Sequence, residues 1–489
     1  MQVLMASPEV VPFAKTGGLA DVAGALPLAL AKEGVAASII MPCYPGLEQK
    51  FSARPAGVEV TVPILEGDQW LGKTGLILET RSGKDVPVYL VKCDEYYNRP
   101  TLYGTPEGDF PDNAARFTFF SRAVLEFVKA KGMKPDLIHC HDWQSALIPV
   151  FLKTTLRDDP RLSGIRTAFT IHNLGYQGKF WKWDMKLLGL SWDYFTPEYL
   201  EFYGDVNFLK GGLVFADVLN TVSKGYAKEI QTAEYGCGLE GVLQSRSKDL
   251  FGILNGIDYA IWDPETDAKL PARFSAKDPK GKARCKQELQ KIFGLPDEPK
   301  TPLIGCISRL ADQKGFDLIE QSFAWLMAEG VQFALLGTGE KHYHEVFQAL
   351  AKKYPNQAGI KIAYDDAVAH LIEAGADLFL MPSRYEPCGL NQMISLKYGT
   401  IPVVRATGGL DDTIQNFSAR TGKGNGFKFK EYSADALMKK LGEAIKLYRQ
   451  QPKAWEQLVK KAMKEDHSWG AKAKEYLALY ARALRKKTA

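Results

Sequence analysis

The sequence lacks several features that would place it in particular classes of protein. No apolar run reaches the ~18 residues that a membrane-spanning helix needs. The N-terminus, MQVLMASPEV, has no basic region before an apolar one and no cleavage signal, so we expect a strand to begin at once. These absences predict a protein without a membrane partner. We expect it to be cytoplasmic, or located in the plastid stroma after removal of a transit peptide.

Cysteine is scarce and unpatterned, and metal-binding motifs are missing. The seven cysteines are scattered without a C-x-x-C pair, which is typical of a reducing compartment and excludes a disulfide framework. The sequence has no H-E-x-x-H, no Asp-x-Asp and no G-x-S-x-G. His139 and His141, two apart on a predicted strand, point to one face and invite a metal interpretation. No third ligand lies at a recognised spacing, so we expect no metal site.

The sequence also lacks a large excess of charge of either sign. Lys and Arg total 62 against 57 Asp and Glu, a formal charge of +5 spread over 489 residues. That excess is too weak to predict a nucleic-acid partner. Any anionic ligand must therefore be met by cations placed locally.

What the sequence does contain is a series of short apolar strands alternating with helical stretches. One series comprises 3–6, 37–41, 86–91, 136–140, 167–172 and 217–222, and a second comprises 303–308, 333–337, 361–364, 377–382 and 401–406. Near-continuous apolar strands of this kind favour parallel sheets covered by helices on both faces. A polar stretch, 263–302, separates the series. We therefore predict two doubly wound α/β domains, with the crossing near Asn255–Asp258.

Two glycine-rich turns have matching sequences. KTGGLAD (15–21) and TGGLDD (407–412) each follow a predicted strand and precede a predicted helix. Gly17 and Gly18 allow a ligand to approach the backbone closely, and the N–H groups at the start of a helix favour a phosphate. Gly-Gly alone would suggest only a structural turn. The adjacent charge of Lys15 and the repeated motif favour a pair of anion-binding turns.

A third glycine-rich segment carries a weaker signal. GCGLEG (236–241) matches the dinucleotide fingerprint G-x-G-x-x-G, which requires a strand immediately before it. The preceding residues, 223–235, are expected to be helical. A structural loop is the better interpretation.

Polar residues also follow several of the predicted strands. SRLADQKG (308–315) carries Arg309 and Lys314, which could bind phosphate or could be ordinary surface cations. SRYEPCGL (383–390) carries Glu386, a possible catalytic carboxylate in a strand-terminal loop, and Cys388, which could equally be a small buried residue. HCHDW (139–143) and IHN (171–173) end two further strands. Open α/β sheets bind ligands at this edge.

Taken in order, these segments closely resemble the bacterial glycogen synthase and plant starch synthase family, glycosyltransferase family 5. The resemblance extends over essentially the whole chain. It rests on KTGGLADV, HDWQ (141–144), TIHNLGYQG (170–178), NTVS (220–223), GILNGID (252–258), SRLADQKG, MPSRYEPCGL (381–390), RATGGLDDT (405–413) and HSWGAKAKEYLALY (467–480).

The resemblance implies a GT-B arrangement: two facing Rossmann-like domains with the active site in the cleft. It implies an acceptor-side domain at 1–254, a donor-nucleotide domain at 255–464, and a C-terminal helix at 465–489 that packs back on the first domain. The implied reaction moves glucose from ADP-glucose to the non-reducing end of an α-1,4-glucan, such as a maltooligosaccharide, glycogen or starch. Configuration is retained, and neither metal nor cofactor takes part.

Site residues implied by the resemblance fall into three groups. The catalytic group comprises Glu386, His172, Arg309 and Lys314. Donor binding is assigned to Lys15, Gly18, Arg309, Lys314, Asn255, Tyr364, Cys388, Gly389, Leu390, Thr407, Gly408 and Gly409. Acceptor binding is assigned to Asp21, Tyr97, Asp142, Trp143 and Asn173.

Two departures from the family pattern lie near the expected nucleotide pocket. Tyr385 stands where Phe is usual, and Asp365–Asp366 follow Tyr364 where the family often has another pair. Nucleotide preference is the property they affect, and a sucrose synthase-like enzyme using UDP-glucose is the alternative within the fold. A hypothesis from another functional class, an NAD-dependent oxidoreductase, requires a strand before G-x-G-x-x-G, and no strand is predicted there. A silent glucan-binding protein would not need the diphosphate cations.

Overall fold

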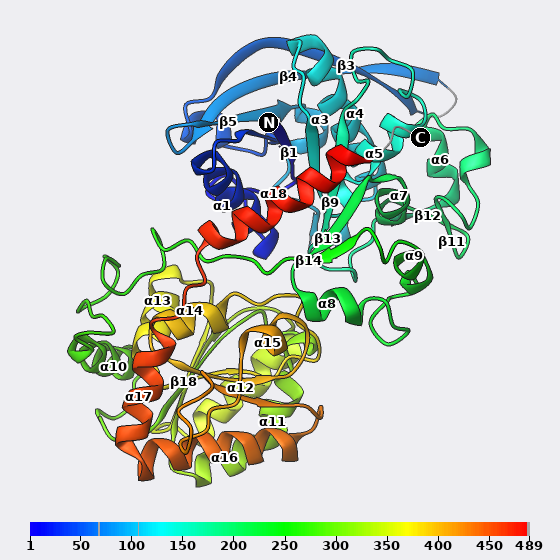
Figure 1. Ribbon diagram of the computed structural model, residues 1–489. Helices are drawn as coiled ribbons and strands as arrows, with labels where there is room; N and C mark the ends of the chain where they lie inside the picture. Colours follow the sequence, from blue (N-terminus) through cyan, green and yellow to red (C-terminus); the bar gives the residue numbers. More distant parts are fainter. Residues whose placement is uncertain (67–68, 106, 487–489) are drawn as a thin grey trace. The chain divides into compact units, whose positions relative to one another are not determined.

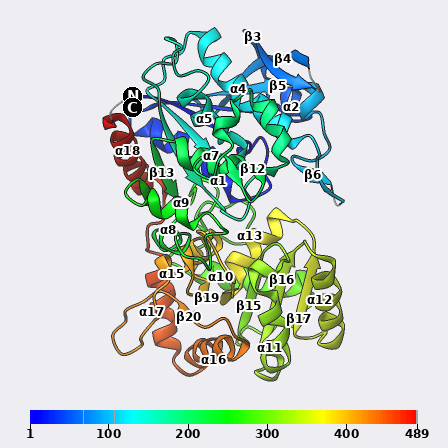
Figure 2. The ribbon, with the colours of Figure 1, turned by 90° about the vertical axis from the view of Figure 1, so that its right-hand side faces the viewer.

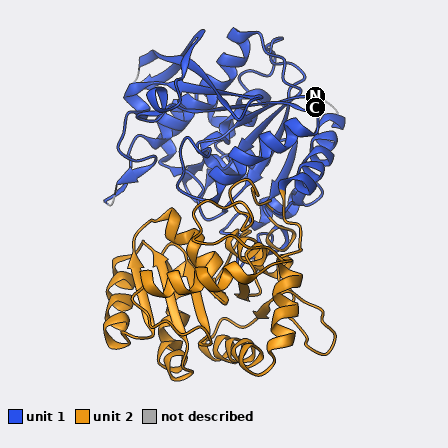
Figure 3. Ribbon diagram, turned by 90° about the vertical axis from the view of Figure 1, so that its left-hand side faces the viewer, with its two compact units in different colours: residues 1–222, 227–254, 469–489 blue, residues 223–226, 255–468 orange. Residues whose placement is uncertain are grey.

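The computed structural model describes the chain except for residues 67–68, 106 and 487–489 (Figure 1). Contacts divide it into two compact units (Figure 3). Unit 1 comprises Met1–Val222, Ala227–Leu254 and Trp469–Ala489, and unit 2 comprises Ser223–Tyr226 and Asn255–Ser468. No described helix is both long enough and apolar enough to cross a membrane.

Unit 1 is built on a large sheet whose central strands are parallel. Its order is β14 (Leu250–Gly252), β13 (Val218–Thr221), β9 (Arg166–Ile171), β8 (Leu137–His141), β1 (Gln2–Ala6), β2 (Ala36–Pro42), β5 (Val86–Lys92), β4 (Gln69–Ser82) and β3 (Arg54–Glu66). The last two strands form an antiparallel hairpin that extends the sheet beyond β5. Sequence periodicity predicted the parallel strands and missed this hairpin.

Helices cover the unit 1 sheet, and every residue of β8 and β9 is buried. The helices of unit 1 are α1 (Gly18–Lys32), α2 (Leu47–Lys50), α3 (Asp94–Tyr97), α4 (Asn113–Lys131), α5 (Leu147–Lys153), α6 (Met185–Leu188), α7 (Phe208–Phe215), α9 (Glu240–Ser245) and α18 (Trp469–Arg485). Helix α8 (Lys224–Glu229) begins in unit 2 and ends in unit 1. Short antiparallel ladders join β10 (Lys179–Phe180), β12 (Asp205–Asn207) and β11 (Glu201–Phe202), and pair β6 (Gly104–Thr105) with β7 (Gly108–Asp109).

The C-terminal helix α18 belongs to unit 1 and packs against α1 and the strands β8, β9 and β13 (Figure 1, red). Tyr476, Leu479 and Tyr480 are buried on its inner face, as its apolar stripe predicts. Leu484, in contrast, is exposed. It lies in the last turn of the helix, beyond the stretch whose inner face is buried.

Unit 2 contains a fully parallel sheet with the order β17 (Ala358–Ile362), β16 (Gln332–Gly337), β15 (Leu303–Ile307), β18 (Leu378–Met381), β19 (Ile401–Arg405) and β20 (Phe427–Phe429). Figure 2 shows β15, β16 and β17 side by side, with α12 next to β17. The covering helices are α10 (Lys280–Ile292), α11 (Phe316–Ala328), α12 (Lys341–Lys353), α13 (Asp366–Gly375), α14 (Asn391–Lys397), α15 (Gly408–Thr413), α16 (Ala434–Gln450) and α17 (Pro452–Ala462). The doubly wound α/β architecture expected from the sequence is confirmed.

Strand order reverses once in each parallel array. In unit 1 the chain builds β1, β2 and β5 to one side and then β8, β9 and β13 to the other, so the reversal lies between β1 and β8. In unit 2 it lies between β15 and β18. Loops that leave the carboxyl ends of the two strands at such a reversal diverge and leave a crevice, where open α/β sheets bind ligands. This geometry indicates where a site should lie in each unit.

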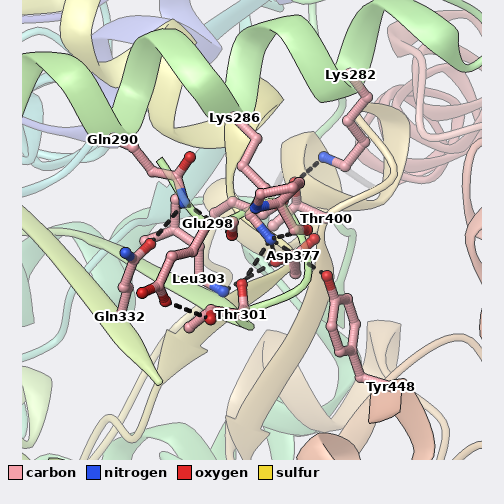
Figure 4. Close-up of polar contacts among 12 residues, drawn as sticks. Lys282, Lys286, Gln290, Glu298, Thr301, Leu303, Gln332, Asp377, Thr400 and Tyr448 are labelled. Atoms are coloured by element: carbon pink, nitrogen blue, oxygen red, sulfur yellow. Dashed lines mark hydrogen bonds and ion pairs between the residues drawn. The ribbon is translucent and has the colours of Figure 1, made fainter. Parts of the chain in front are cut away.

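A buried polar network holds the opposite, amino-terminal edge of the unit 2 sheet (Figure 4). Helix α10, within the polar stretch 263–302, presents Lys282, Lys286 and Gln290 along one face. The Lys286 ammonium donates to the carbonyls of Pro299 (3.1 Å) and Thr301 (2.6 Å), the Asp377 carboxylate (2.7 Å) and the Tyr448 hydroxyl (3.2 Å). The buried cation thereby fixes α10 to the starts of β15 and β18.

Candidate functional site

The site in unit 2 is centred on an ion pair between the loops that follow β15 and β18. Lys314 Nζ donates to Glu386 Oε2 at 2.7 Å, and the Ser383 hydroxyl donates to the same oxygen at 3.1 Å. Glu386 is 6% exposed. An ammonium has three N–H donors, and Glu386 is the partner found for Lys314 within the described residues. Lys314 therefore retains donors for a ligand.

Close backbone contacts hold these two loops together. Gly315 has φ of +75°, and a Cβ there would lie 2.2 Å from the carbonyl oxygen of Pro382. Only glycine accommodates both the conformation and the contact. The Arg384 N–H also donates to the Gln313 carbonyl at 2.8 Å. The positions of Lys314 and Glu386 are thus set by backbone packing on rigid strands.

The second glycine-rich turn packs directly onto the Glu386 loop. The Gly409 N–H donates to the carbonyls of Glu386 (3.1 Å) and Pro387 (3.2 Å), and a Cβ on Gly409 would lie 2.1 Å from the Cys388 carbonyl oxygen. The sequence interpretation treated this turn as an anion-binding one with available N–H groups. In this structure the neighbouring loop uses the Gly409 N–H, and donor binding at this turn stays a prediction.

A segment that sequence reasoning passed over completes this side of the site. Ser223 Oγ donates to the Pro387 carbonyl at 2.6 Å, and the Gly225 N–H donates to Asp412 Oδ2 at 2.7 Å. Residues 223–226 therefore support both the Glu386 loop and the turn at 407–412. The motif NTVS (220–223) includes Ser223, but its local pattern does not predict which residues Ser223 contacts.

The other residues proposed for unit 2 occupy varied positions around these loops. Arg309 is exposed beside Gln313, with 3.4 Å between its guanidinium and the amide oxygen. Tyr364, just beyond β17, is 79% exposed, which leaves its ring face available for stacking. Asn255 is buried, and its side-chain oxygen has no partner among the described residues.

The residues proposed for donor binding in the loops before α14 and α15 are mostly enclosed. Cys388 and Thr407 are buried. Gly389 has φ of +70°, and Leu390 and Gly408 lie at the starts of α14 and α15.

In unit 1, the loop after β1 is organised by Glu9, a buried residue that sequence reasoning missed. Its carboxylate accepts hydrogen bonds from the Thr16 N–H, the Thr16 hydroxyl (2.6 Å), the Gly17 N–H (3.3 Å) and the Tyr103 hydroxyl (2.7 Å). A side chain of the protein thus fills part of the nest of N–H groups that we had assigned to an external anion. The helix α1 begins immediately afterwards, at Gly18.

Lys15 and Asp21 form an ion pair across the first turn of α1, with 2.8 Å between Nζ and Oδ1. Burial raises the pKa of Asp21, and the adjacent Lys15 partly offsets this rise. The family resemblance implies donor binding for Lys15 and acceptor binding for Asp21. The structure brings the two side chains together, so a change in one will affect the other.

Asp142 and His172 meet where β8 and β9 end. Asp142 has φ of +53°, and its carboxylate accepts the His172 N–H at 2.7 Å. Burial raises the pKa of Asp142 to about 8. Burial also lowers the pKa of His172 to about 3, so its imidazole is neutral at physiological pH. His172 Nε2 lies 2.9 Å from His141 Nδ1, and one shared proton fixes the tautomers of both rings.

This histidine cluster continues inward to the C-terminal helix. His139 packs on His141 at 4.2 Å between ring centroids and contacts the Tyr480 hydroxyl at 2.9 Å and the Thr170 hydroxyl at 2.6 Å. The two histidines do share a face, as the strand pattern predicted. Among the described residues, no group of three His, Cys, Asp or Glu could hold a metal ion.

The remaining acceptor candidates lie deeper than expected. Tyr97 is completely buried, and its hydroxyl donates to the Arg116 carbonyl at 3.0 Å. Its side chain is covered within unit 1, so a role in acceptor binding stays a prediction. Trp143 is buried against Phe117, 4.8 Å between ring centroids. Asn173 is half-buried, and its side-chain oxygen accepts the Gly175 N–H at 3.0 Å.

Comparison with known proteins agrees with this architecture. The family model described as the starch synthase catalytic domain matches residues 2–245, and that of the glycosyl transferases group 1 matches residues 287–465. The glycogen synthase of Koribacter versatilis is 51% identical over 99% of this chain and 98% of its own length. That of Thermosipho africanus is 45% identical over the full length of both chains.

Solved structures give the same result. The catalytic domain of starch synthase IV from Arabidopsis thaliana, bound to ADP and acarbose, matches with a TM-score of 0.90 and 35% identity over 99% of both chains. Sucrose-phosphate synthase from Thermosynechococcus elongatus matches with a TM-score of 0.59 at 15% identity, a likeness of fold alone.

The fold is therefore that of a two-domain GT-B glycosyltransferase with Rossmann-like domains. The chain belongs to the glycogen synthase and starch synthase family. It is accordingly a glucosyltransferase of glycogen or starch synthesis, acting on a nucleotide-sugar donor and a glucan acceptor.

Proposed function

We propose that this enzyme transfers glucose from ADP-glucose to the non-reducing end of an α-1,4-glucan with retention of configuration. The Lys314–Glu386 pair carries the proposal: a cation with donors to spare lies 2.7 Å from a buried carboxylate at the strand reversal of unit 2. A reaction that separates a diphosphate anion from a developing cation needs both charges close together. The relative bound to ADP and acarbose supports this choice of donor and acceptor chemistry.

On the donor side, we assign the diphosphate to Lys15, Arg309 and Lys314. Three cations would neutralise the leaving group, with the backbone at Gly18 and around Gly408–Gly409 shaping the pocket. Tyr364, exposed at the end of β17, would stack on the adenine. The side-chain oxygen of Asn255, which has no partner among the described residues, would accept a hydrogen bond from a hydroxyl of the donor. The loop Cys388–Leu390 would contact the glucose.

Glu386 would act at the anomeric carbon. Positive charge develops there as the diphosphate departs, and a buried carboxylate stabilises that charge more in the transition state than in the ground state. Ser383 and Lys314 hold the Glu386 carboxylate in place through its Oε2 atom. The carboxylate therefore does not need to reorganise during the reaction.

On the acceptor side, we assign Asp142, Trp143, Asn173 and Asp21, and we keep His172 in the catalytic group. The neutral His172 imidazole can hydrogen-bond sugar hydroxyls without introducing a positive charge beside the developing cation. Asp142 fixes the His172 backbone. We extend the same proposal to the domain roles, with 1–254 as the acceptor side, 255–464 as the donor side and 465–489 as the terminal helix. The cytoplasmic location also stays a prediction, to be checked by cell fractionation.

The test is a donor competition assay. The protein is incubated with ADP-[14C]glucose and maltooligosaccharides, with UDP-[14C]glucose in a parallel reaction, and labelled glucans are separated by length. We expect label in glucans lengthened by one or more units with ADP-glucose, and sensitivity of that label to α-1,4-specific hydrolysis. Efficient labelling from UDP-glucose instead would refute the proposed donor, and label released as free glucose would refute the transfer.

A further inference from the structure

Tryptophan is distributed unevenly over the surface. The chain has nine tryptophans, and the four that are exposed lie in one region of unit 1. Trp70 comes from β4, and Trp181, Trp183 and Trp192 flank the short helix α6 (Figure 1). Their exposed fractions range from 43% to 65%. We name these four residues, with Phe195, the aromatic patch.

The rings of the aromatic patch are held in a fixed arrangement. Successive pairs from Trp181 through Trp183 and Trp192 to Phe195 have centroids 6.2, 5.4 and 5.4 Å apart and interplanar angles of 69°, 77° and 81°. Edge-to-face packing of this kind stabilises each ring without covering it. The patch therefore offers rigid aromatic faces that lose little conformational entropy when a ligand binds.

The segment beneath the patch is anchored to the body of unit 1. Met185 and Leu188 are buried, and the Arg122 guanidinium donates to the Leu188 carbonyl at 2.6 Å. Gly189, with φ of +60°, ends α6, and a Cβ there would lie 2.9 Å from the Trp70 ring. The aliphatic side chains thus face inward while the indoles face outward.

Charge in this segment is balanced. Residues 181–195 contain two lysines, Lys182 and Lys186, and two aspartates, Asp184 and Asp193. Both ammonium groups lie near the Trp183 ring, 5.5 and 5.9 Å from its centroid. A surface that binds an anionic membrane would carry a net positive charge, which this segment lacks. Exposed aromatic faces bordered by polar groups of both signs suit a neutral ligand that has apolar faces and hydroxyl edges.

We propose that the aromatic patch is a second glucan-binding site, separate from the residues that we assign to the reaction. This inference rests on the glucan acceptor of the proposed function. Pyranose rings would stack on the indoles, and the flanking charged side chains would hydrogen-bond the sugar hydroxyls. A polymer held at the patch presents its chain ends to the enzyme at a raised local concentration. Long acceptors would benefit, and short ones, unable to reach both sites, would not.

The experiment compares polymer and oligomer as acceptors. Trp181→Ala/Trp183→Ala/Trp192→Ala should weaken retention in native gels containing glycogen by at least ~10-fold, the usual effect of removing aromatic anchors. KM for glycogen should rise by a similar factor. KM for maltotriose, KM for the donor and kcat should change less than about twofold. Tyr203→Ala, which removes another exposed aromatic side chain of unit 1, is the matched control.

Two single variants separate stacking from general hydrophobicity. Trp183→Phe keeps an aromatic face and should retain most glycogen binding, whereas Trp183→Leu keeps apolar bulk and should lose it. Equal retention of the triple variant and the wild type overturns the proposal. An equal rise of KM for glycogen and maltotriose overturns it too, since the patch would then belong to the reaction site. Loss of a dimer in light scattering, or of vesicle binding, would assign the patch to a protein or lipid partner instead.

The readouts also distinguish this inference from the proposed function. Gel retention by glycogen measures binding without catalysis. A protein that transferred no glucose but lost glycogen retention in the triple variant would retain the second site and refute only the proposed reaction.

Discussion

The two edges of the unit 2 sheet each carry a lysine–carboxylate pair, and the pairs have the same length but different surroundings. Lys286 lies 2.7 Å from Asp377 at the amino-terminal edge, and Lys314 lies 2.7 Å from Glu386 at the carboxyl-terminal edge. Lys286 has three further oxygen partners besides Asp377. Lys314 has one described partner and spare donors.

The difference indicates how to separate a structural ion pair from a functional one. The oxygen partners of the Lys286 ammonium use all of its N–H donors, so none remains to bind a ligand. An unsaturated cation beside a buried carboxylate, at a strand reversal, is poised for an external anion. Distance and charge alone would have ranked the two pairs as equal. The following predictions test whether one edge serves stability and the other serves the reaction.

The largest expected effect is on stability, from Lys286→Met. The substitution leaves the Asp377 carboxylate and the carbonyls of Pro299 and Thr301, just before β15, without their buried cation. Removing one partner of a buried pair is strongly destabilising, so we expect the free energy of unfolding to fall by about 3 kcal/mol. Denaturant unfolding monitored by circular dichroism measures it. Lys280→Met, an exposed lysine on the same helix, should change stability by less than about 0.5 kcal/mol. Equal midpoints for the two variants would contradict the structural role.

The next effect is on catalysis, from Glu386→Gln. Glutamine keeps the shape of the Glu386 side chain and removes its negative charge. The substitution should therefore weaken stabilisation of the transition state more than it weakens substrate binding. We expect kcat to fall by at least ~10²-fold with a smaller change in KM. Glu373→Gln is the control, because it makes the same replacement at a buried carboxyl group near the amino-terminal edge and should leave kcat unchanged. If Glu386→Gln kept near-normal kcat, Glu386 would be a structural residue like Asp377.

The sequence predicted the parallel strands and the loops that hold the site, because both depend on local pattern. Apolar runs followed by glycine and charge identify a strand that ends at a ligand-binding edge. The polar stretch 263–302 did not predict α10 clearly, because Lys286, which is buried in the structure, resembles a lysine on a solvated helix face. The β3–β4 hairpin was missed because much of β4 is exposed and its side chains form no continuous apolar run.

The partners of the site residues could not have been predicted in the same way. Lys314 meets Glu386 from 72 residues away, and His139 meets Tyr480 from 341 residues away. No local spacing encodes such pairs. Glu9 is a different case, since it lies only seven residues before Thr16. A lone glutamate in a loop resembles any solvated one, and its burial became visible only in the structure.

The smallest expected effect is a pH dependence at the amino-terminal edge, where Glu373 is buried near Lys282. Burial raises the pKa of Glu373 from its ordinary 4.5 to about 8, although the Ser395 hydroxyl donates to it at 2.6 Å. Between these two values the folded protein holds a proton that the unfolded chain has released. Stability should therefore fall as pH rises from 5 to 7.5, by about 1 kcal/mol per pH unit from this group. Burial lowers the pKa of Lys282 to about 8, which affects stability only above that pH and with the opposite sign.

Glu373→Gln should flatten the dependence of stability on pH between pH 5 and 7.5. Glu431→Gln, which changes an exposed carboxyl group in unit 2, should not. Denaturant midpoints measured across that range decide the question. An unchanged slope in Glu373→Gln would show that Glu373 is ionised in the folded protein, with Lys282 as its counterion, and the amino-terminal edge would then contain a second true ion pair.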